Sequence, residues 1–337
     1  MSNIYIGLGG AGIDAVKAVF KKKQSSDGHR RDRFLLIDTD IHDRYDLHGI
    51  LREGFVDIGD KSPNQIKADA LNSPLKRWFL GWYNWYDDNH SLHEGTGTVR
   101  AYGRIGLFGQ YDSIYQCLSD ILCQSANDLQ QEESLNICIY TGSCGGTGSA
   151  IVLDILYMIN TILKSGEVPN ADRCKNVCLF VAMPEMWIDY YKNQPDVQYK
   201  LVSNAVAFFT ELQFVMANAE TVPTPYYPAV PPKSWMQYEP FAPCNCCYYG
   251  VESVGKTKEQ MSQDMAGLNC SCEATPIIAT DVHNLSGNVL AEWIKSHNED
   301  SSGVYSFVDW RFARKVLDLD KDSDVSTEEL WDRMCNQ

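Results

Sequence analysis

The chain has 337 residues, of which 44% are hydrophobic, and it carries a formal net charge of −15 with a sequence pI of about 4.8. The length suits one large domain or two smaller ones, and the acidic charge argues against a general binder of nucleic acid or of anionic membranes. The sequence has no run of about 18 apolar residues that would predict a membrane helix and no secretion leader at Met1–Ile6, so we expect a cytoplasmic protein whose twelve cysteines are reduced thiols.

A glycine loop lies close to the start of the chain. Ile4-Tyr5-Ile6 predicts a short strand, Gly7–Gly12 form the loop, and Ile13–Lys22 have the pattern of a helix. A second strand follows at Arg33–Ile37 and ends in Asp38-Thr39-Asp40. Taken alone, this arrangement fits the dinucleotide fingerprint with Asp38 as the acid on the ribose, and it keeps an NAD-dependent Rossmann oxidoreductase as an alternative.

An aromatic stretch and a further glycine loop come next. The aromatic cluster Trp78–Tyr86 could stack a base or pack a long excursion onto the body of the protein. Gly95-Thr96-Gly97 precedes a helix that is predicted over Arg100–Cys123. Arg100 and Arg104 are four residues apart and share a face of that helix, from which they would meet either phosphate oxygens or nearby carboxylates.

The most conspicuous glycine loop spans Gly142–Ala150. It follows an apolar stretch, Leu135–Thr141, that predicts a strand, and it precedes a helix that is predicted over Ile151–Lys164. Unpaired N–H groups and the positive end of the helix dipole meet at such a helix start, and glycines let the backbone approach a ligand, so the loop suits a phosphate. Thr147 and Ser149 add hydroxyl donors. The alternative is a tight turn at a strand–helix junction.

The remaining elements complete an α/β pattern. Strands are predicted at Asn176–Met183 and Cys244–Val251, and helices at Gln198–Ala219, Thr257–Ala266 and Asp281–Ser296. Strands that alternate with helices predict a doubly wound, mostly parallel sheet with helices on both faces. Ligands of such sheets bind outside the carboxyl ends of the strands, so we expect all three glycine loops at one edge of the sheet.

Four of these segments together resemble the tubulin and FtsZ superfamily. Gly145–Ser149 is similar to its signature loop, Gly7–Gly12 to its first phosphate loop, Asp38–Asp40 to its Asn-Thr-Asp segment, and Gly95–Gly97 with Gly103-Arg104 to its loop near the terminal phosphate. The aromatic excursion ahead of the last of these resembles the large bacterial "tubulin-like" proteins. The resemblance covers roughly Met1 to Val251.

This resemblance implies a GTP or GDP ligand, Mg²⁺ on its phosphates, self-assembly into a filament or oligomer, and slow GTP hydrolysis that depends on contact between subunits. Two alternatives stay open besides the oxidoreductase: a nucleotide switch with a protein partner, and a structural or adaptor protein that has lost hydrolysis. Asp14 falls at the family's base-contacting position, where a carboxylate can accept from guanine. Asn204 is a further candidate for the nucleotide, and the expected alternative for it is an ordinary surface position. The implied nucleotide contacts are Gly9, Gly10, Ala11, Asp14, Asp38, Thr39, Asp40, Gly95, Thr96, Gly97, Arg104, Ser143, Cys144, Gly145, Gly146, Thr147, Gly148 and Ser149.

We expect residues 1–250 to form the nucleotide-binding domain and residues 251–337 to form a linking helix and a short, atypical C-terminal region with an acidic tail. Gly267-Leu268-Asn269, with Glu273 beyond, resembles the acidic loop that completes hydrolysis in the family from the next subunit. No catalytic residue is assigned from it.

Two further groups of side chains have the chemistry of metal ligands. A thiolate zinc site is one interpretation of the five cysteines Cys244, Cys246, Cys247, Cys270 and Cys272, and a cysteine-rich strand is the other. Acids in Asp318–Leu330 fall at positions one, three, five and twelve of a calcium loop, although Ser323 stands where that loop needs glycine. The alternative for this stretch is a solvated acidic tail.

Overall fold

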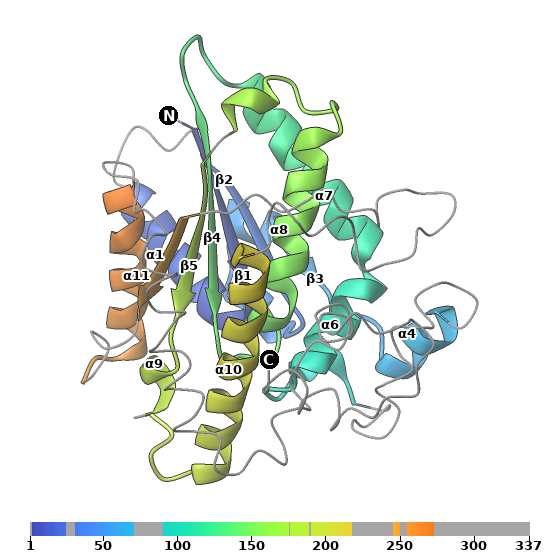
Figure 1. Ribbon diagram of the computed structural model, residues 1–337, viewed down its shortest axis with the longest axis vertical. Helices are drawn as coiled ribbons and strands as arrows, with labels where there is room; N and C mark the ends of the chain where they lie inside the picture. The colour runs from blue at the N-terminus through green and yellow to red at the C-terminus, as the bar shows by residue number, and fades with distance from the viewer. Residues whose placement is uncertain are drawn as a thin grey trace.

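The computed structural model describes residues 2–24, 31–70, 90–174, 176–188, 190–217, 245–249 and 255–272. They form a central sheet with helices on both of its faces (Figure 1). None of the helices in these ranges is long and apolar enough to cross a membrane.

The sheet has six strands in the order β3-β2-β1-β4-β5-β6, and every neighbouring pair is parallel. The strands are β1 (Ser2–Leu8), β2 (Arg33–Asp38), β3 (Phe55–Asp57), β4 (Leu135–Gly142), β5 (Asn176–Ala182) and β6 (Asn245–Tyr249). β1 and β4 are buried along their whole length because helices cover both faces. The predicted doubly wound α/β fold is therefore confirmed.

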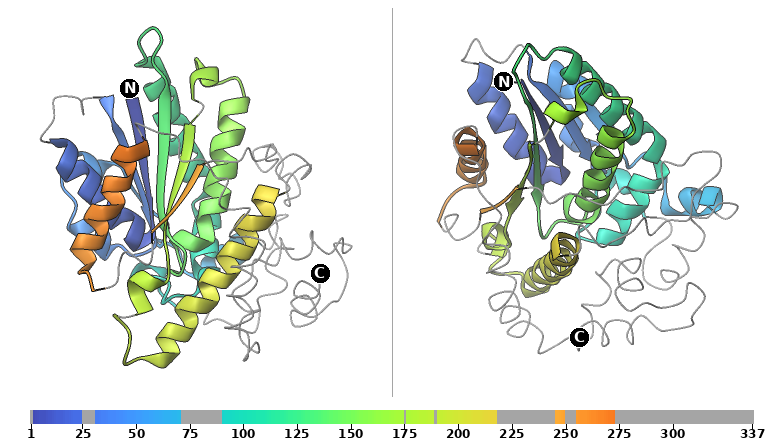
Figure 2. Two further views of the ribbon diagram at one scale, coloured as in Figure 1. Left: turned by 60° about the vertical axis from the view of Figure 1, so that its left-hand side comes forward. Right: turned by 45° about the horizontal axis from the view of Figure 1, so that its top comes forward.

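One face of the sheet is covered by α1 (Gly9–Gln24) and α11 (Lys258–Cys272), as Figure 2 shows in its right-hand view. The strand side chains on this face include Tyr5, Tyr140 and Phe180, and the last two rings stack with centroids 4.7 Å apart. Because side chains alternate along a strand, the neighbours of these residues face the other way.

The opposite face packs against α6 (Arg100–Gly109), α7 (Tyr111–Asn127), α8 (Gly148–Lys164) and α10 (Pro195–Ala217). Ile4, Ile6 and Leu8 of β1 belong to this second apolar cluster, to which Ile137 and Ile139 of β4 also contribute. Successive residues of each strand therefore belong alternately to one cluster and the other, as expected for a parallel sheet that is buried on both faces.

Smaller elements fill the long connections. They are α2 (His42–Tyr45), α3 (Ile50–Glu53), α4 (Pro63–Ala70) and α9 (Glu185–Ile188), with single 3₁₀ turns at Leu92–Glu94 and Ala171–Arg173. The short strand β3 was not anticipated.

The helix predicted over Arg100–Cys123 is two helices. It breaks at Gln110, whose φ and ψ are −121° and 19° and whose N–H donates to both Gly106 and Leu107. Gly109, next to the break, admits Ile66 of α4 to a distance that a side chain would exclude. The prediction missed the break because the apolar periodicity runs through it.

The boundary that the sequence suggested near residue 250 falls between β6 and α11. α11 packs on α1 and contributes Met261 and Met265 to the cluster on that face. The predicted helix Asp281–Ser296, the aromatic cluster Trp78–Tyr86 and the acidic tail lie outside the described residues.

Candidate functional site

The glycine loops lie together at the carboxyl edge, which we define as the edge of the sheet formed by the C-terminal ends of the strands. The chain leaves β1 at Leu8 and β4 at Gly142 on this edge. These two strands are neighbours, but the chain builds one half of the sheet outward from β1 and the other half outward from β4. The connections after them therefore leave toward opposite faces, and doubly wound folds bind their ligands in a crevice at such a switch point, outside the ends of the strands.

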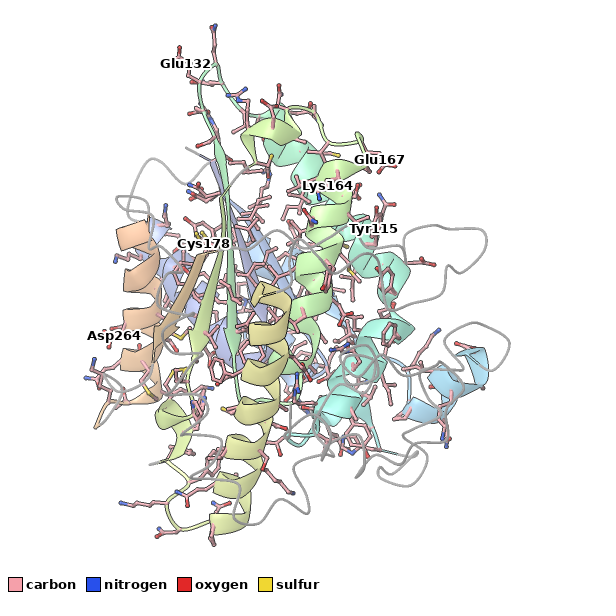
Figure 3. All side chains as sticks on the ribbon, in the orientation of Figure 1. Tyr115, Glu132, Lys164, Glu167, Cys178 and Asp264 are labelled. Carbon is pink, nitrogen blue, oxygen red and sulfur yellow. The ribbon has the colours of Figure 1, made fainter. Side chains whose placement is uncertain are left out.

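The opposite edge is occupied by turns and helix ends. Figure 3 shows Glu132 and Glu167 at this end of the molecule, with Lys164, in the last turn of α8, just below Glu167. α8 therefore runs from the carboxyl edge, where its first residue Gly148 lies, to the amino edge. Its positive dipole end lies at the crevice.

The central loop, residues 143–147, is anchored at its start and open in its middle. The N–H and hydroxyl groups of Ser143 both donate to the carbonyl of Ala182 in β5, at 2.9 and 2.8 Å. A Cβ atom placed on Gly145 would have no atom within 4 Å. Within the described part of the chain, the amides of Gly145, Gly146 and Thr147 donate to no backbone carbonyl. A row of unpaired amides at a helix start is suited to an anion.

The first loop brings the start of α1 against the start of α8. Gly9 has a φ of +67°, and a Cβ atom there would lie 2.8 Å from the amide nitrogen of Gly148. Gly10 and Ala11 are half-buried and follow directly. The first amides of a helix have no partner inside it, so two helix starts present N–H groups to one crevice.

The segment after β2 ties itself to the central loop. The hydroxyls of Thr39 and Thr147 are 2.9 Å apart. Asp38 is buried and accepts from the amides of Thr39 and Asp40 at 2.7 and 3.4 Å, so it holds its own loop instead of facing a ribose. Asp40 is half-buried; one oxygen accepts from the amide of His42 at 2.9 Å, and the other has no hydrogen-bond donor among the residues described.

Negative charge is concentrated beside the first loop. Burial, together with the charge of Asp43 in α2, raises the pKa of Asp38 to about 7. Burial also raises the pKa of Asp43. An oxygen of Asp43 lies 3.3 Å from where a Cβ atom would stand on Gly10. This carboxylate therefore borders the start of α1, although no sequence motif marks it.

The loop Gly95-Thr96-Gly97 packs on the central loop. A side chain on Gly146 would collide with Thr96 Oγ1 and would stand 2.9 Å from the amide nitrogen of Val99. Gly146 is therefore required for contact between the two loops. Gly97, with a φ of +54°, has open space where its side chain would stand.

Arg100 and Arg104 share a face of α6, but both end in buried ion pairs. Arg100 pairs with Glu211 of α10 at 2.6 Å, and Arg104 pairs with Asp154 of α8 at 3.0 Å. Both guanidinium groups are at most 4% exposed. The expectation that Arg104 contacts a phosphate is therefore corrected: its role is the carboxylate pair, which was the alternative.

Asp14 lies one turn into α1 and is engaged by two lysines. Lys258 Nζ of α11 is 2.6 Å from Oδ2, and Lys17 Nζ is 3.6 Å from Oδ1. The N–H groups of a base would therefore have to donate to a carboxylate that two lysines already engage. Asp14 also lines a groove of about 740 Å³ between α1 and α11. Asp14 is the only one of the predicted nucleotide contacts among the residues that line this groove.

Asn204 was expected at the surface, and that expectation is wrong. Its side chain is fully buried, and Nδ2 donates to the carbonyls of Thr98 and Cys144 at 2.6 and 2.9 Å. The sequence held a signal for its burial, because Asn204 lies three residues after Leu201 and four before Phe208 on the apolar stripe of its helix.

Gly267-Leu268-Asn269, the candidate acidic loop, belongs to α11, and this expectation is also corrected. Glu273 lies outside the described residues. Among the described residues, no group of three or more His, Cys, Asp or Glu side chains could hold a metal ion. Cys246 and Cys247 lie in β6, whereas Cys244 and the tail Asp318–Leu330 are outside the described part.

Comparison with known proteins gives two findings. A family model described as "Tubulin like" matches residues 4–297. The chain is also similar to a solved structure titled "CetZ2 from Haloferax volcanii - GTPgS bound protofilament", with 12% sequence identity and a TM-score of 0.45 over 84% of this chain. The match covers 62% of that chain, so the present chain spans less than two thirds of its length. No curated protein matches.

Proposed function

Because the chain belongs to the tubulin-like protein family, we propose that it binds GTP or GDP outside the carboxyl ends of β1 and β4, between the loops that follow these two strands. This proposal rests mainly on one observation: the glycine-rich starts of α1 and α8 are in contact with each other. They meet next to β1 and β4, where the order in which the chain adds strands to the sheet reverses. One such loop is common to many folds. Two that touch, with unpaired amides, provide donors for more than one phosphate.

The phosphates would lie along the two loops. Gly145, Gly146 and Thr147 would donate to the terminal phosphates, with α8 behind them, and Gly10 and Ala11 would donate to the inner ones. Ser143, Cys144, Thr96 and Thr39 would act mainly by holding these loops, because their side chains are buried. Gly95 and Gly97 would border the terminal phosphate.

Mg²⁺ fits this site through Asp40. The described residues offer no cage of protein ligands, but Mg²⁺ is commonly held by one or two carboxylates together with substrate phosphates and water. Asp40 is half-buried and keeps one oxygen available. The ion would neutralise phosphate charge, which matters here because Asp38 and Asp43 are close by.

Guanine selectivity, assembly and hydrolysis form the finer part of the proposal. The base would reach Asp14, whose pairing with Lys258 has to loosen for a direct contact. Self-assembly, slow hydrolysis at a contact between subunits and a place in the cytoplasm are part of this proposal, and membership of the tubulin-like family supports them. The oxidoreductase alternative explains the loop after β1 but gives no role to the loop after β4. Both this second loop and membership of the tubulin-like family favour a guanine nucleotide over NAD.

Calorimetric titration of the full chain tests this proposal. With Mg²⁺ present, GTP and GDP should bind with one site per chain, and ATP and NAD should bind at least about tenfold more weakly, a difference of about 1.4 kcal/mol. Equal affinity for NAD would favour the oxidoreductase. Absence of binding by any of the four would leave the crevice without its proposed ligand.

A further inference from the structure

We propose that Asn204 of α10 is a positioning residue that fixes the loop before α6 and the central loop relative to each other, in the arrangement that the phosphates need. The inference rests on the proposed nucleotide site. It assigns to α10, which supplies no predicted phosphate contact, control over the geometry of that site.

The orientation of the Asn204 amide is determined by its partners. Thr98 O and Cys144 O are carbonyl oxygens and can only accept, so the atom 2.6 and 2.9 Å from them must be the NH₂ nitrogen. Thr98 belongs to the loop before α6, and Cys144 to the central loop. One side chain with no exposed surface therefore joins the two loops.

A second contact ties the first turn of α8, which directly follows the central loop, to the same helix. Glu211 lies two turns after Asn204 on α10 and forms a two-pronged pair with Arg100, at 2.9 and 2.6 Å. The same guanidinium donates to the hydroxyl and the carbonyl of Ser149, at 3.1 and 2.9 Å. α10 thus holds Cys144 directly and Ser149 through Arg100. The residues between them, Gly145–Gly148, include the open part of the loop.

The bonds of Asn204 to the two loops account for an asparagine among apolar neighbours. It stands on an apolar stripe with Leu201, Ala205 and Phe208, all buried. Its Oδ1 atom is buried and has no hydrogen-bond donor in the described part of the chain. An acceptor left without a donor costs stability. An apolar side chain of similar size would avoid that cost, but it would take the Nδ2 donor away from the carbonyls of Thr98 and Cys144. The bonds to the two loops are therefore what the amide contributes at this position.

Asn204→Ala removes both bonds and is the principal variant. Without nucleotide, we expect faster amide hydrogen exchange in residues 95–99 and 143–149, with exchange in β1 and β4 unchanged. With nucleotide, we expect the affinity for GTP to fall by about tenfold or more, because two hydrogen bonds that set the loop geometry are gone. Asn204→Gln keeps an NH₂ donor and should recover part of the affinity.

Leu212→Ala is the matched control. It removes apolar volume from the same buried part of α10 and removes no hydrogen bond. It should lower the melting temperature at least as much as Asn204→Ala, yet keep the GTP affinity of the folded protein within about threefold. If Asn204→Ala does not fold, Asn204→Gln replaces it, with a smaller change expected in the same two loops.

Three results would overturn the inference: exchange in the two loops that equals the wild type, GTP affinity that equals the wild type, or an equal loss of affinity in Leu212→Ala. If the wild type itself fails to bind GTP, the proposed function fails. The exchange comparison without nucleotide would then still decide whether Asn204 positions the loops.

Discussion

Gly145→Asp is the substitution that addresses the phosphate site with the least disturbance of the fold. Gly145 has no atom within 4 Å of its missing Cβ position and has no positive φ, so a side chain can be accommodated. For a separation of about 6 Å between a carboxylate there and a bound phosphate, the repulsion follows from Coulomb's law. Two unit charges at that distance repel by about 0.7 kcal/mol in water and about 2.8 kcal/mol at an effective dielectric of about 20. The affinity for GTP should therefore fall by about threefold to a hundredfold for each phosphate charge that is felt.

Isothermal titration with GTP and Mg²⁺ measures this loss, and circular dichroism and thermal melting check that the variant is folded. Gly145→Ala is the control: it adds the same Cβ atom without charge and should change the affinity by less than about threefold. Gly146 is unsuitable for this test because its side chain would collide with Thr96. A folded Gly145→Asp protein that binds GTP as the wild type does would refute the placement of the phosphates at the central loop.

Three other predictions concern the buried charges and turnover. Arg104→Ala removes the buried pair with Asp154 and should lower the free energy of unfolding, measured in urea, by about 3–5 kcal/mol. Arg33→Ala breaks an exposed pair and should cost at most about 1 kcal/mol. Equal costs would contradict the role of the buried pair. The pKa of Asp38 is raised to about 7, so the folded state binds this proton more tightly than the unfolded state does. The free energy of unfolding of the wild type should therefore fall as the pH rises from about 4 to about 7, by up to about 4 kcal/mol. Asp38→Asn should remove that decline, and parallel pH profiles would refute the assignment. Phosphate release from GTP should be small in dilute protein and rise per molecule with concentration, together with light scattering; rapid release without scattering, linear in protein, would indicate a complete active site in one chain.

The parallel sheet and its carboxyl edge could be predicted because they depend on local patterns. Short apolar runs followed by glycine loops and helical periodicity mark each strand–loop–helix unit, and the rule that parallel strands end at one edge brings the loops together. The break at Gln110 and the short strand β3 were missed because each depends on tertiary contacts more than on periodicity. Local sequence patterns were therefore sufficient to predict the strands, the glycine loops and the edge of the sheet at which the loops meet.

The partners of the charged and polar side chains could not be predicted, since they come from distant parts of the chain. Arg104 and Asp154 are 50 residues apart, and Asp14 meets Lys258 across two helices. Asn204 contacts Thr98 and Cys144 from an element that no motif marked. A sequence motif identifies which residues can bind a phosphate, but the three-dimensional arrangement decides which of them are already used to hold the loops.

The identity of the nucleotide carried by the purified protein tests the central claim most directly. The chain should be purified in the presence of Mg²⁺ without added nucleotide and then denatured, and the released compounds should be separated by chromatography and quantified against protein. We predict GDP or GTP as the main nucleotide, bound in the crevice between the loops after β1 and β4, and a reduced amount from Gly145→Asp. NAD or an adenine nucleotide as the main compound would contradict the account.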